Sequence, residues 1–256
     1  MSKEQELQIA KLTTYLLPLY KKEFPIIFFW TPRSGCTTLM RWFFFQNGLL
    51  QKAMDYNPWV HSYRMEVFEK GNHYRADIID QILAGKKDTY KLVRNPYRRA
   101  VSSFLASIDN DKIMKEIAPN YHNGFSFKEF LYLIRKIGVS KNQLNSHIAQ
   151  QYDEGEEVII KDYVRLENFS TEMKAIENKY RLLDSPILSI SNSSHHLSGQ
   201  MVEKGAFANV KMSLKPYGKT LPTYESFYDK ETKELVRELF KKDFEKYGYN
   251  QTNITI

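Results

Sequence analysis

Residues 25–43 read PIIFFWTPRSGCTTLMRWF, an apolar run followed by a turn and a second apolar-rich stretch. The run at 25–30 is continuous rather than alternating, which is typical of a central strand covered on both faces. Residues 31–38 form the turn, and the pattern from residue 39 onward is helical until Asn47-Gly48 stops it. The stretch therefore predicts a strand, a tight turn and a helix in succession.

The turn at residues 31–38 has the composition of an anion-binding loop. The first N–H groups of a helix lack partners inside the helix, and with the helix dipole they bind phosphate or sulfate oxygens. Gly35 permits a close backbone approach, and Arg33 supplies a permanent charge on a planar fork. Thr37 and Thr38 add hydroxyl donors. A tight crossover with a solvated Arg33 is the alternative, and this turn alone leaves both open.

A second segment with anion-binding side chains follows another predicted strand. Tyr90 to Val93 is that strand, and Arg94 stands at its carboxyl end, where α/β sheets place their ligands. Asn95 suits the N-cap and Pro96 the first position of the next helix. Ser102 lies about two turns into this helix, and a guanidinium and a hydroxyl on one phosphate form charge-assisted hydrogen bonds. An ion pair for Arg94 and a packing role for Ser102 are the alternative.

The rest of the chain alternates between strand and helix patterns. Helices are expected at 3–20, at 76–84, from the capping-box pair Ser126 and Glu129 to Ile137, near 171–180, and from Asp229 to Gly248, and strands at 157–161 and 186–190. Residues 191–222 show little periodicity and are expected to form a long loop or lid. Such alternation predicts a mostly parallel sheet with helices on both faces.

Composition places the chain among folded proteins that bind anions. Of its 256 residues 42% are hydrophobic, which argues against disorder, and the net charge of +7 suggests anionic ligands in general. The single cysteine, Cys36, excludes an intrachain disulfide framework and a multi-cysteine zinc site. The early apolar run at 24–30 is far below the ~20 residues that span a bilayer, and without a targeting signal we expect the cytoplasm.

Both candidate segments resemble parts of known sulfotransferases. Residues 31–39 resemble the 5′-phosphosulfate loop of that family, and Arg94 to Ser102 resembles its 3′-phosphate segment. The similarity is closest to the Golgi-type carbohydrate sulfotransferases, and it continues at 162–168 and 227–249. It implies a sulfotransferase fold, with a P-loop-like central parallel β-sheet flanked by helices, formed by residues 1–256 as a single domain.

The resemblance also implies a cofactor and the residues that bind it. The cofactor is 3′-phosphoadenosine 5′-phosphosulfate (PAPS), with adenosine 3′,5′-bisphosphate (PAP) as product and no metal. The residues implied at its 5′ end are Arg33, Ser34, Gly35, Cys36, Thr37 and Thr38, and those at its 3′-phosphate are Arg94 and Ser102. Many relatives have Lys where this chain has Arg33, which is also expected to act in catalysis through its charge, because Arg does not deprotonate.

A hydroxyl acceptor, in this family a glycan or other polyol, needs a base. Histidine titrates near neutral pH, and His73 is the first choice. It precedes Arg94 by 21 residues, and Gly71 to Tyr74 resembles the segment that carries the base in some carbohydrate O-sulfotransferases. The alternatives that stay open are Glu66, Glu69 and His61, and His147 lies in a segment similar to one near the acceptor in relatives.

Three other functions are weighed against an O-sulfotransferase. A P-loop nucleotide kinase is disfavoured, because the turn lacks the G-x-x-x-x-G-K-[ST] spacing and no Mg²⁺-binding acid follows a strand. A relative that kept the nucleotide site but lost activity would carry the same motifs. A nucleic-acid-binding protein fits the net charge, but 30 acidic residues lie among the 37 basic ones and no nucleic-acid-binding motif is present. We therefore expect no nucleic-acid partner and no membrane span.

Overall fold

The computed structural model describes residues 3–71, 73–119, 124–191, 197–213 and 220–252. The chain divides into two compact units. The first holds residues 1–93 and 153–195, and the second holds residues 94–152 and 196–256. The single domain predicted over residues 1–256 stays a prediction.

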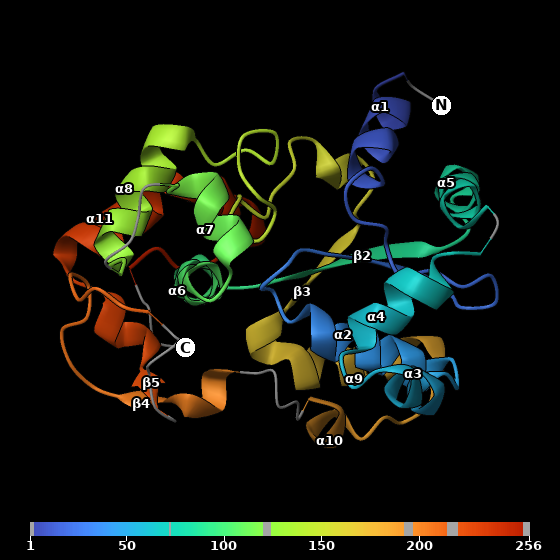
Figure 1. The fold of residues 1–256 in the computed structure, drawn as a ribbon. Helices are drawn as coiled ribbons and strands as arrows, with labels where there is room; N and C mark the ends of the chain where they lie inside the picture. Colours follow the sequence, from blue (N-terminus) through green and yellow to red (C-terminus); the bar gives the residue numbers. More distant parts are fainter. Residues whose placement is uncertain (1–2, 72, 120–123, 192–196, 214–219, 253–256) are drawn as a thin grey trace. The chain divides into compact units, whose positions relative to one another are not determined.

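The first unit is built on a parallel three-stranded sheet (Figure 1). Its strands are β1 (Ile26–Trp30), β2 (Asp88–Val93) and β3 (Asp162–Arg165), in the order β1-β2-β3. All five residues of β1 are buried, as its continuous apolar run predicts. The predicted parallel sheet, with strands at 25–30 and 90–93, is therefore confirmed.

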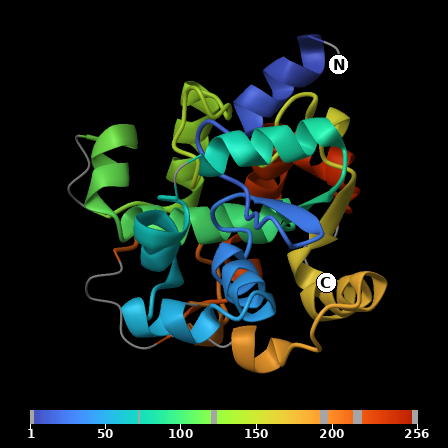
Figure 2. The same ribbon diagram turned by 90° about the vertical axis from the view of Figure 1, so that its right-hand side faces the viewer.

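Helices cover both faces of this sheet because successive residues of β1 point to opposite sides. Phe28 packs in a core with residues of α2 (Cys36–Gln46) and α9 (Phe169–Tyr180). Phe29 packs in another core with residues of α1 (Lys3–Leu12) and α5 (Tyr74–Ala84). Figure 2 shows β1 between α5 above and α2 below. This unit also contains α3 (Leu50–Tyr56), α4 (Val60–Tyr63), α10 (Ile187–Ser191), a π-helical turn at Arg64–Phe68, and 3₁₀ turns at Glu156–Val158 and Leu166–Asn168.

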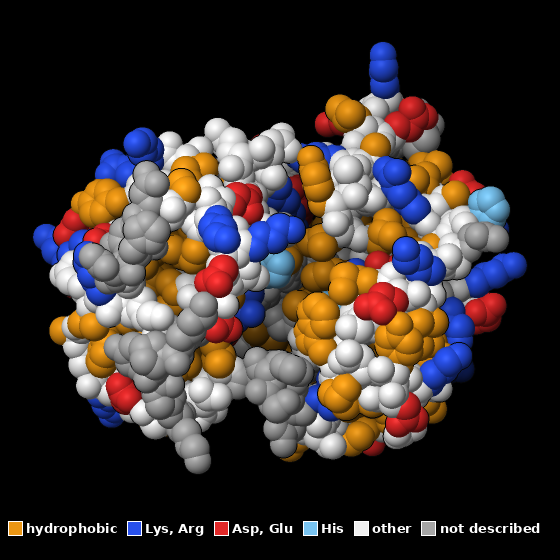
Figure 3. Space-filling view, in the orientation of Figure 1, with side chains coloured by type: hydrophobic (Ala, Val, Ile, Leu, Met, Phe, Trp, Pro, Cys, Tyr) orange, Lys and Arg blue, Asp and Glu red, His pale blue; other side chains and the backbone are white. Residues whose placement is uncertain are grey.

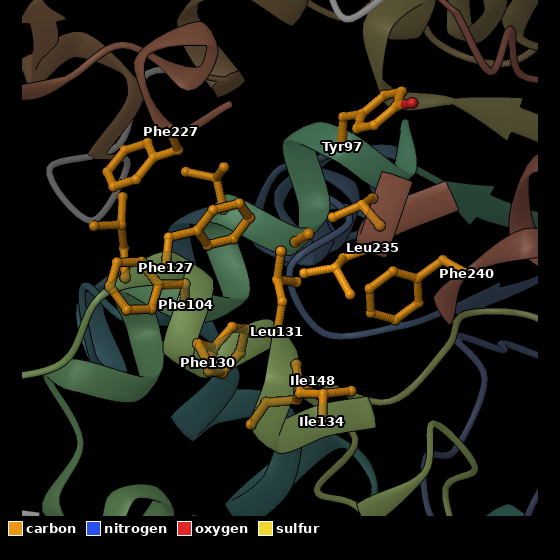
Figure 4. Close-up of a cluster of buried hydrophobic side chains, with 14 of the residues drawn as sticks. Tyr97, Phe104, Phe127, Phe130, Leu131, Ile134, Ile148, Phe227, Leu235 and Phe240 are labelled. Carbon is orange, nitrogen blue, oxygen red and sulfur yellow. The ribbon is translucent and has the colours of Figure 1, made fainter. Parts of the chain in front are cut away.

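The second unit has a core of helices around α6 (Pro96–Ile108), as Figure 4 shows. The ring of Phe104 on α6 lies 5.6 Å from that of Phe127, 5.5 Å from Phe130 and 5.9 Å from Phe227. The other elements here are α7 (Asp111–Ile117), α8 (Phe127–Ile137), α11 (Lys230–Leu239), α12 (Lys241–Tyr247), 3₁₀ turns at Leu197–Gln200 and Tyr224–Phe227, and the paired strands β4 (Met201–Glu203) and β5 (Leu221–Pro222). Within the described ranges, no helix is long and apolar enough to cross a membrane.

Helix boundaries predicted from capping residues are confirmed. The Asn95 side chain accepts from the N–H groups of Tyr97 and Arg98, with Pro96 at the first helical position. Ser126 and Glu129 form the predicted capping box of α8. These ends agree because a cap is a local interaction between neighbouring residues.

Two of the predicted strands are wrong. Residues 187–190 of the predicted strand at 186–190 belong to α10, in which Ile187 and Ile190 are buried and Leu188 is exposed, a helical rather than alternating spacing. At 157–161 the chain makes a 3₁₀ turn, and the strand begins only at Asp162. Burial of Glu156 against Lys91 holds this turn in place.

Three further boundaries differ from the prediction. The first helix ends at Leu12 rather than near residue 20. A helix through residues 14–20 is disfavoured by Pro18, which lacks an N–H and whose ring clashes with the carbonyl four residues earlier. The single helix predicted from Asp229 to Gly248 is two helices, α11 and α12, which meet at Phe240. The predicted loop at 191–222 contains β4 and β5 in its described part, and 192–196 and 214–219 lie outside the described residues.

Candidate functional site

The turn between β1 and α2 has the backbone of an anion-binding loop. Gly35, with φ +89°, stands at the N-cap of α2, so no side chain at that position accepts from the first N–H groups of the helix. Arg33 also has positive φ, at 67°, which is uncommon for a residue with a Cβ and recurs at functional turns. The buried Ser34 hydroxyl donates to the Thr31 carbonyl at 2.6 Å and closes the turn. The predicted succession of strand, tight turn and helix is therefore confirmed, and anion binding at this turn stays a prediction.

A close contact accounts for glycine at position 35. A Cβ there would lie 2.4 Å from Cδ1 of Leu166. Leu166 directly follows β3, within the 162–168 segment that resembles sulfotransferases. Since β2 pairs with β3 and with β1, the sheet brings this segment to the loop. Leu166, in the 162–168 segment, therefore packs directly against the turn at Gly35.

His61 contacts the helical end of the loop. Its Nε2 lies 3.2 Å from Oγ1 of Thr37 and 3.7 Å from Sγ of Cys36. The imidazole is buried and stacks on Trp59 with ring centroids 5.1 Å apart. The sequence left His61 as an open alternative for the base, and the structure places it where it orients the Thr37 hydroxyl.

Three further candidate side chains are Cys36, at the start of α2, and Glu66 and Glu69, in and directly after the π-helical turn at Arg64–Phe68. Burial raises the pKa of the Cys36 thiol, against the smaller lowering effect of Arg33, so a thiolate nucleophile is disfavoured. Glu69 pairs with Arg64 at 2.8 Å, and burial raises the pKa of its carboxyl while Arg64 lowers it. Glu66 accepts from the Tyr56 hydroxyl at 2.7 Å. The two glutamates therefore have structural partners of their own.

His73 lies at the start of α5, at its N-cap position with φ 74°. Its backbone carbonyl accepts from the Asp77 N–H at 2.8 Å, and its side chain is exposed. Within the described residues, no hydrogen bond joins its imidazole to residues 31–38, and its neighbour Asn72 lies outside them. The role of His73 as base stays a prediction.

Arg94 lies in the second unit, immediately before the cap of α6. One guanidinium nitrogen donates to the Tyr224 hydroxyl at 2.8 Å, and Gln151 pairs with its backbone N–H and C=O. Ser102 is buried on α6. Arg99 is buried and donates to the carbonyls of the 146–149 segment, so its role is structural.

Sequence reasoning missed three residues around Arg94. They are Arg98, Gln151 and Tyr224. The spacing of Arg98 and Ser102, four residues apart on a helix, was a signal for the first of them. His147, in the same unit, is exposed and its Nδ1 lies 2.9 Å from Oδ1 of Asn145. Across the part of the chain that the structure describes, no three His, Cys, Asp or Glu side chains gather as a metal site.

Comparison with protein families gives one match over nearly the whole chain. Residues 19–250 match the family described as the sulfotransferase family. The matched range contains both candidate segments and parts of both units. No curated protein and no solved structure matches the chain.

Proposed function

Because the chain belongs to the sulfotransferase family, we propose that it transfers a sulfuryl group from PAPS to a hydroxyl of a carbohydrate. The observation that carries this proposal is the turn at 31–38. It combines an N-cap without a side chain, a guanidinium at Arg33 and two threonine hydroxyls at the start of a helix. This is the donor set that a sulfate or phosphate group requires.

The residues of the turn fit the 5′ end of the nucleotide. A methyl group at position 35 would fill the space where Leu166 packs, so the loop depends on glycine to keep its N–H groups oriented. When bound, PAPS would supply an activated sulfuryl group: a bond forms between the acceptor oxygen and the sulfur, the bond from the sulfur to the 5′-phosphate oxygen breaks in line with it, and PAP leaves. Arg33 stabilises the charge that develops during this displacement, and Thr37 and Thr38 donate hydrogen bonds to it.

His73 and His61 have separate roles in the proposal. His73 accepts the proton of the acceptor hydroxyl, a role supported by its spacing from Arg94 and by an exposed imidazole that an acceptor reaches from solvent. His61 positions Thr37 through the 3.2 Å contact between Nε2 and Oγ1. Arg94 and Ser102 bind the 3′-phosphate, as the resemblance at 94–102 implies.

Two alternatives are less well supported. A nucleotide kinase would need a lysine in the turn, whereas position 33 is Arg and no Lys occurs from 31 to 38. A nucleic-acid-binding protein would need a continuous basic surface. On the face shown in Figure 3, Lys and Arg side chains are interspersed with Asp and Glu. A cytoplasmic location stays a prediction of the sequence.

Calorimetry with PAP, with ATP as the control nucleotide, tests the binding step. We expect a tight signal for PAP, none for ATP, and loss of the PAP signal in Arg94→Ala. Arg135→Ala removes an exposed guanidinium that pairs with Glu238 and is the matched control. A wild-type protein that binds ATP but not PAP would contradict the proposal.

Transfer from radiolabelled PAPS to a panel of sugars and polyols tests the chemical step. We expect turnover with at least one acceptor, and we expect His73→Ala to bind PAP normally while losing turnover. Binding of PAP without turnover on any acceptor would identify an inactive nucleotide-binding relative. Wild-type turnover in His73→Ala would remove that residue as the base and leave His61 to be tested.

A further inference from the structure

Two guanidinium groups near the start of α6 contact one tyrosine ring. The Cζ atoms of Arg94 and Arg98 each lie 5.4 Å from the centroid of the Tyr224 ring. The Tyr224 hydroxyl accepts a hydrogen bond from Arg94 at 2.8 Å. All three side chains are half-buried, and all three belong to the second unit. Both positive charges therefore contact the same ring.

Arg98 lies on the same face of α6 as Ser102. Both are within the helix and four residues apart, and residues at that spacing are neighbours on a helix surface. The backbone N–H groups of Tyr97 and Arg98 are already taken by the Asn95 side chain, at 3.0 Å and 3.3 Å. An anion at this end of α6 is therefore held by side chains rather than by the helix terminus.

The charge of this cluster matches one class of ligand. The Arg98 Nε is buried and, within the described residues, has no hydrogen-bond partner. Tyr224 contributes a ring and a hydroxyl, neither of which carries a charge at neutral pH. Two arginines suit a phosphate monoester, which carries close to two negative charges at neutral pH. A sulfate ester, with one negative charge, is a poorer match.

We propose that Arg98 and Arg94 together form a two-arginine site for a phosphate monoester, with Tyr224 positioning both guanidinium groups. The proposal rests on the proposed function, since that monoester is then the 3′-phosphate of the nucleotide. It assigns selection of a 3′-phosphorylated nucleotide to Arg98 and Tyr224 in addition to Arg94 and Ser102.

Calorimetry with two nucleotides measures this selection directly. PAP and adenosine 5′-monophosphate differ in the 3′-phosphate, so the ratio of their dissociation constants reports that group alone. We expect Arg98→Ala and Arg98→Gln, which keeps a longer side chain, to weaken the binding of PAP by about tenfold or more, because a hydrogen bond to a charged group contributes about 1.5–3 kcal/mol. Both variants should keep the affinity for adenosine 5′-monophosphate within about twofold of wild type, and Arg135→Ala should leave the affinity for both nucleotides unchanged.

Tyr224 variants separate positioning from packing. Tyr224→Phe removes the hydroxyl and keeps the ring, so we expect it to reduce the ratio less than Tyr224→Ala does. Thermal unfolding of each variant identifies any that lose the fold. An unchanged ratio in folded Arg98→Gln would overturn the inference while PAP binding by the wild type still stood. Failure of the wild type to prefer PAP would instead refute the proposed function.

Discussion

The side-chain amide of Gln151 pairs with both backbone polar groups of Arg94. Its Oε1 accepts from the Arg94 N–H at 2.9 Å, and its Nε2 donates to the Arg94 carbonyl at 2.8 Å. Gln151 is held in turn by Asp243 on α12, whose buried carboxylate accepts from the N–H groups of Gln151 and Tyr152 at 2.9 Å and 2.7 Å. The backbone of Arg94 is therefore fixed from the interior of the second unit.

Gln151→Leu should weaken both stability and nucleotide selection. The change keeps the volume of a fully buried side chain but leaves the Arg94 N–H and C=O without these partners. We expect the free energy of unfolding to fall by about 1–3 kcal/mol, measured by urea denaturation. We also expect weaker PAP binding with little change for adenosine 5′-monophosphate. Gln143→Leu, at an exposed glutamine, is the control, and equal losses for both nucleotides would contradict a positioning role.

Gly35→Ala should damage the loop in two separable ways. The new Cβ would clash with Leu166 at 2.4 Å, and φ +89° is unfavourable for alanine by about 1–2 kcal/mol. We expect PAP binding and turnover to be lost in the single variant. Adding Leu166→Ala relieves the clash but leaves the backbone strain, so the double variant should regain only part of the stability that urea denaturation measures. Full recovery would show that φ at residue 35 is free to change.

The elements that sequence predicted best are those set by neighbouring residues. The Asn95 cap and the Ser126–Glu129 box lie within one helical turn, and both ends are where their residues place them. The prediction of a strand at 157–161 was wrong because Ile159 and Ile160 are buried in the core that contains Phe29 of β1, rather than by pairing in the sheet. A buried turn and a buried strand have the same apolar residues over so short a length.

The candidate site shows the same difference between local and long-range interactions. The turn around Gly35 and the start of α6 are contiguous in sequence, so their residues were predictable together. The contacts that orient them are not contiguous, because His61 reaches Thr37 across 24 residues and Tyr224 reaches Arg94 across 130. No rule of sequence spacing applies over such separations, so these partners can be identified only from the tertiary structure.

Asp88 should make part of the stability depend on pH. A hydrogen bond from Tyr180, followed by one from Lys161 at 3.2 Å, holds the pKa of the Asp88 carboxyl below its ordinary value. A depressed pKa stabilises the fold above the unfolded pKa, near 3.9 for Asp, and this stability is lost as pH falls through the folded pKa. Asp88→Asn should therefore be less stable than wild type at pH 7.

Urea denaturation from neutral pH to about pH 3 measures this effect, since that interval includes the unfolded pKa of Asp. The wild type should lose more of its free energy of unfolding over this range than Asp88→Asn does. Asp162→Asn, at an exposed aspartate on β3, is the control and should follow the wild type. Parallel pH curves for wild type and Asp88→Asn would contradict the assignment.

The contact between His61 and Thr37 should appear as coupling in a double-mutant cycle. If His61 orients the Thr37 hydroxyl, then removing either side chain removes the same interaction, and removing both costs little more. We expect His61→Ala and Thr37→Ala each to weaken the binding of PAP by about three- to tenfold. The double variant should bind PAP as weakly as the weaker-binding of the two single variants, which corresponds to a coupling free energy of about 1 kcal/mol. Calorimetry at one pH gives all four affinities.

Thr38→Ala combined with His61→Ala is the control. The losses of PAP affinity in this pair should be additive, because adjacent helical residues do not share a face. Additive losses in the His61 and Thr37 pair would show that the histidine acts elsewhere.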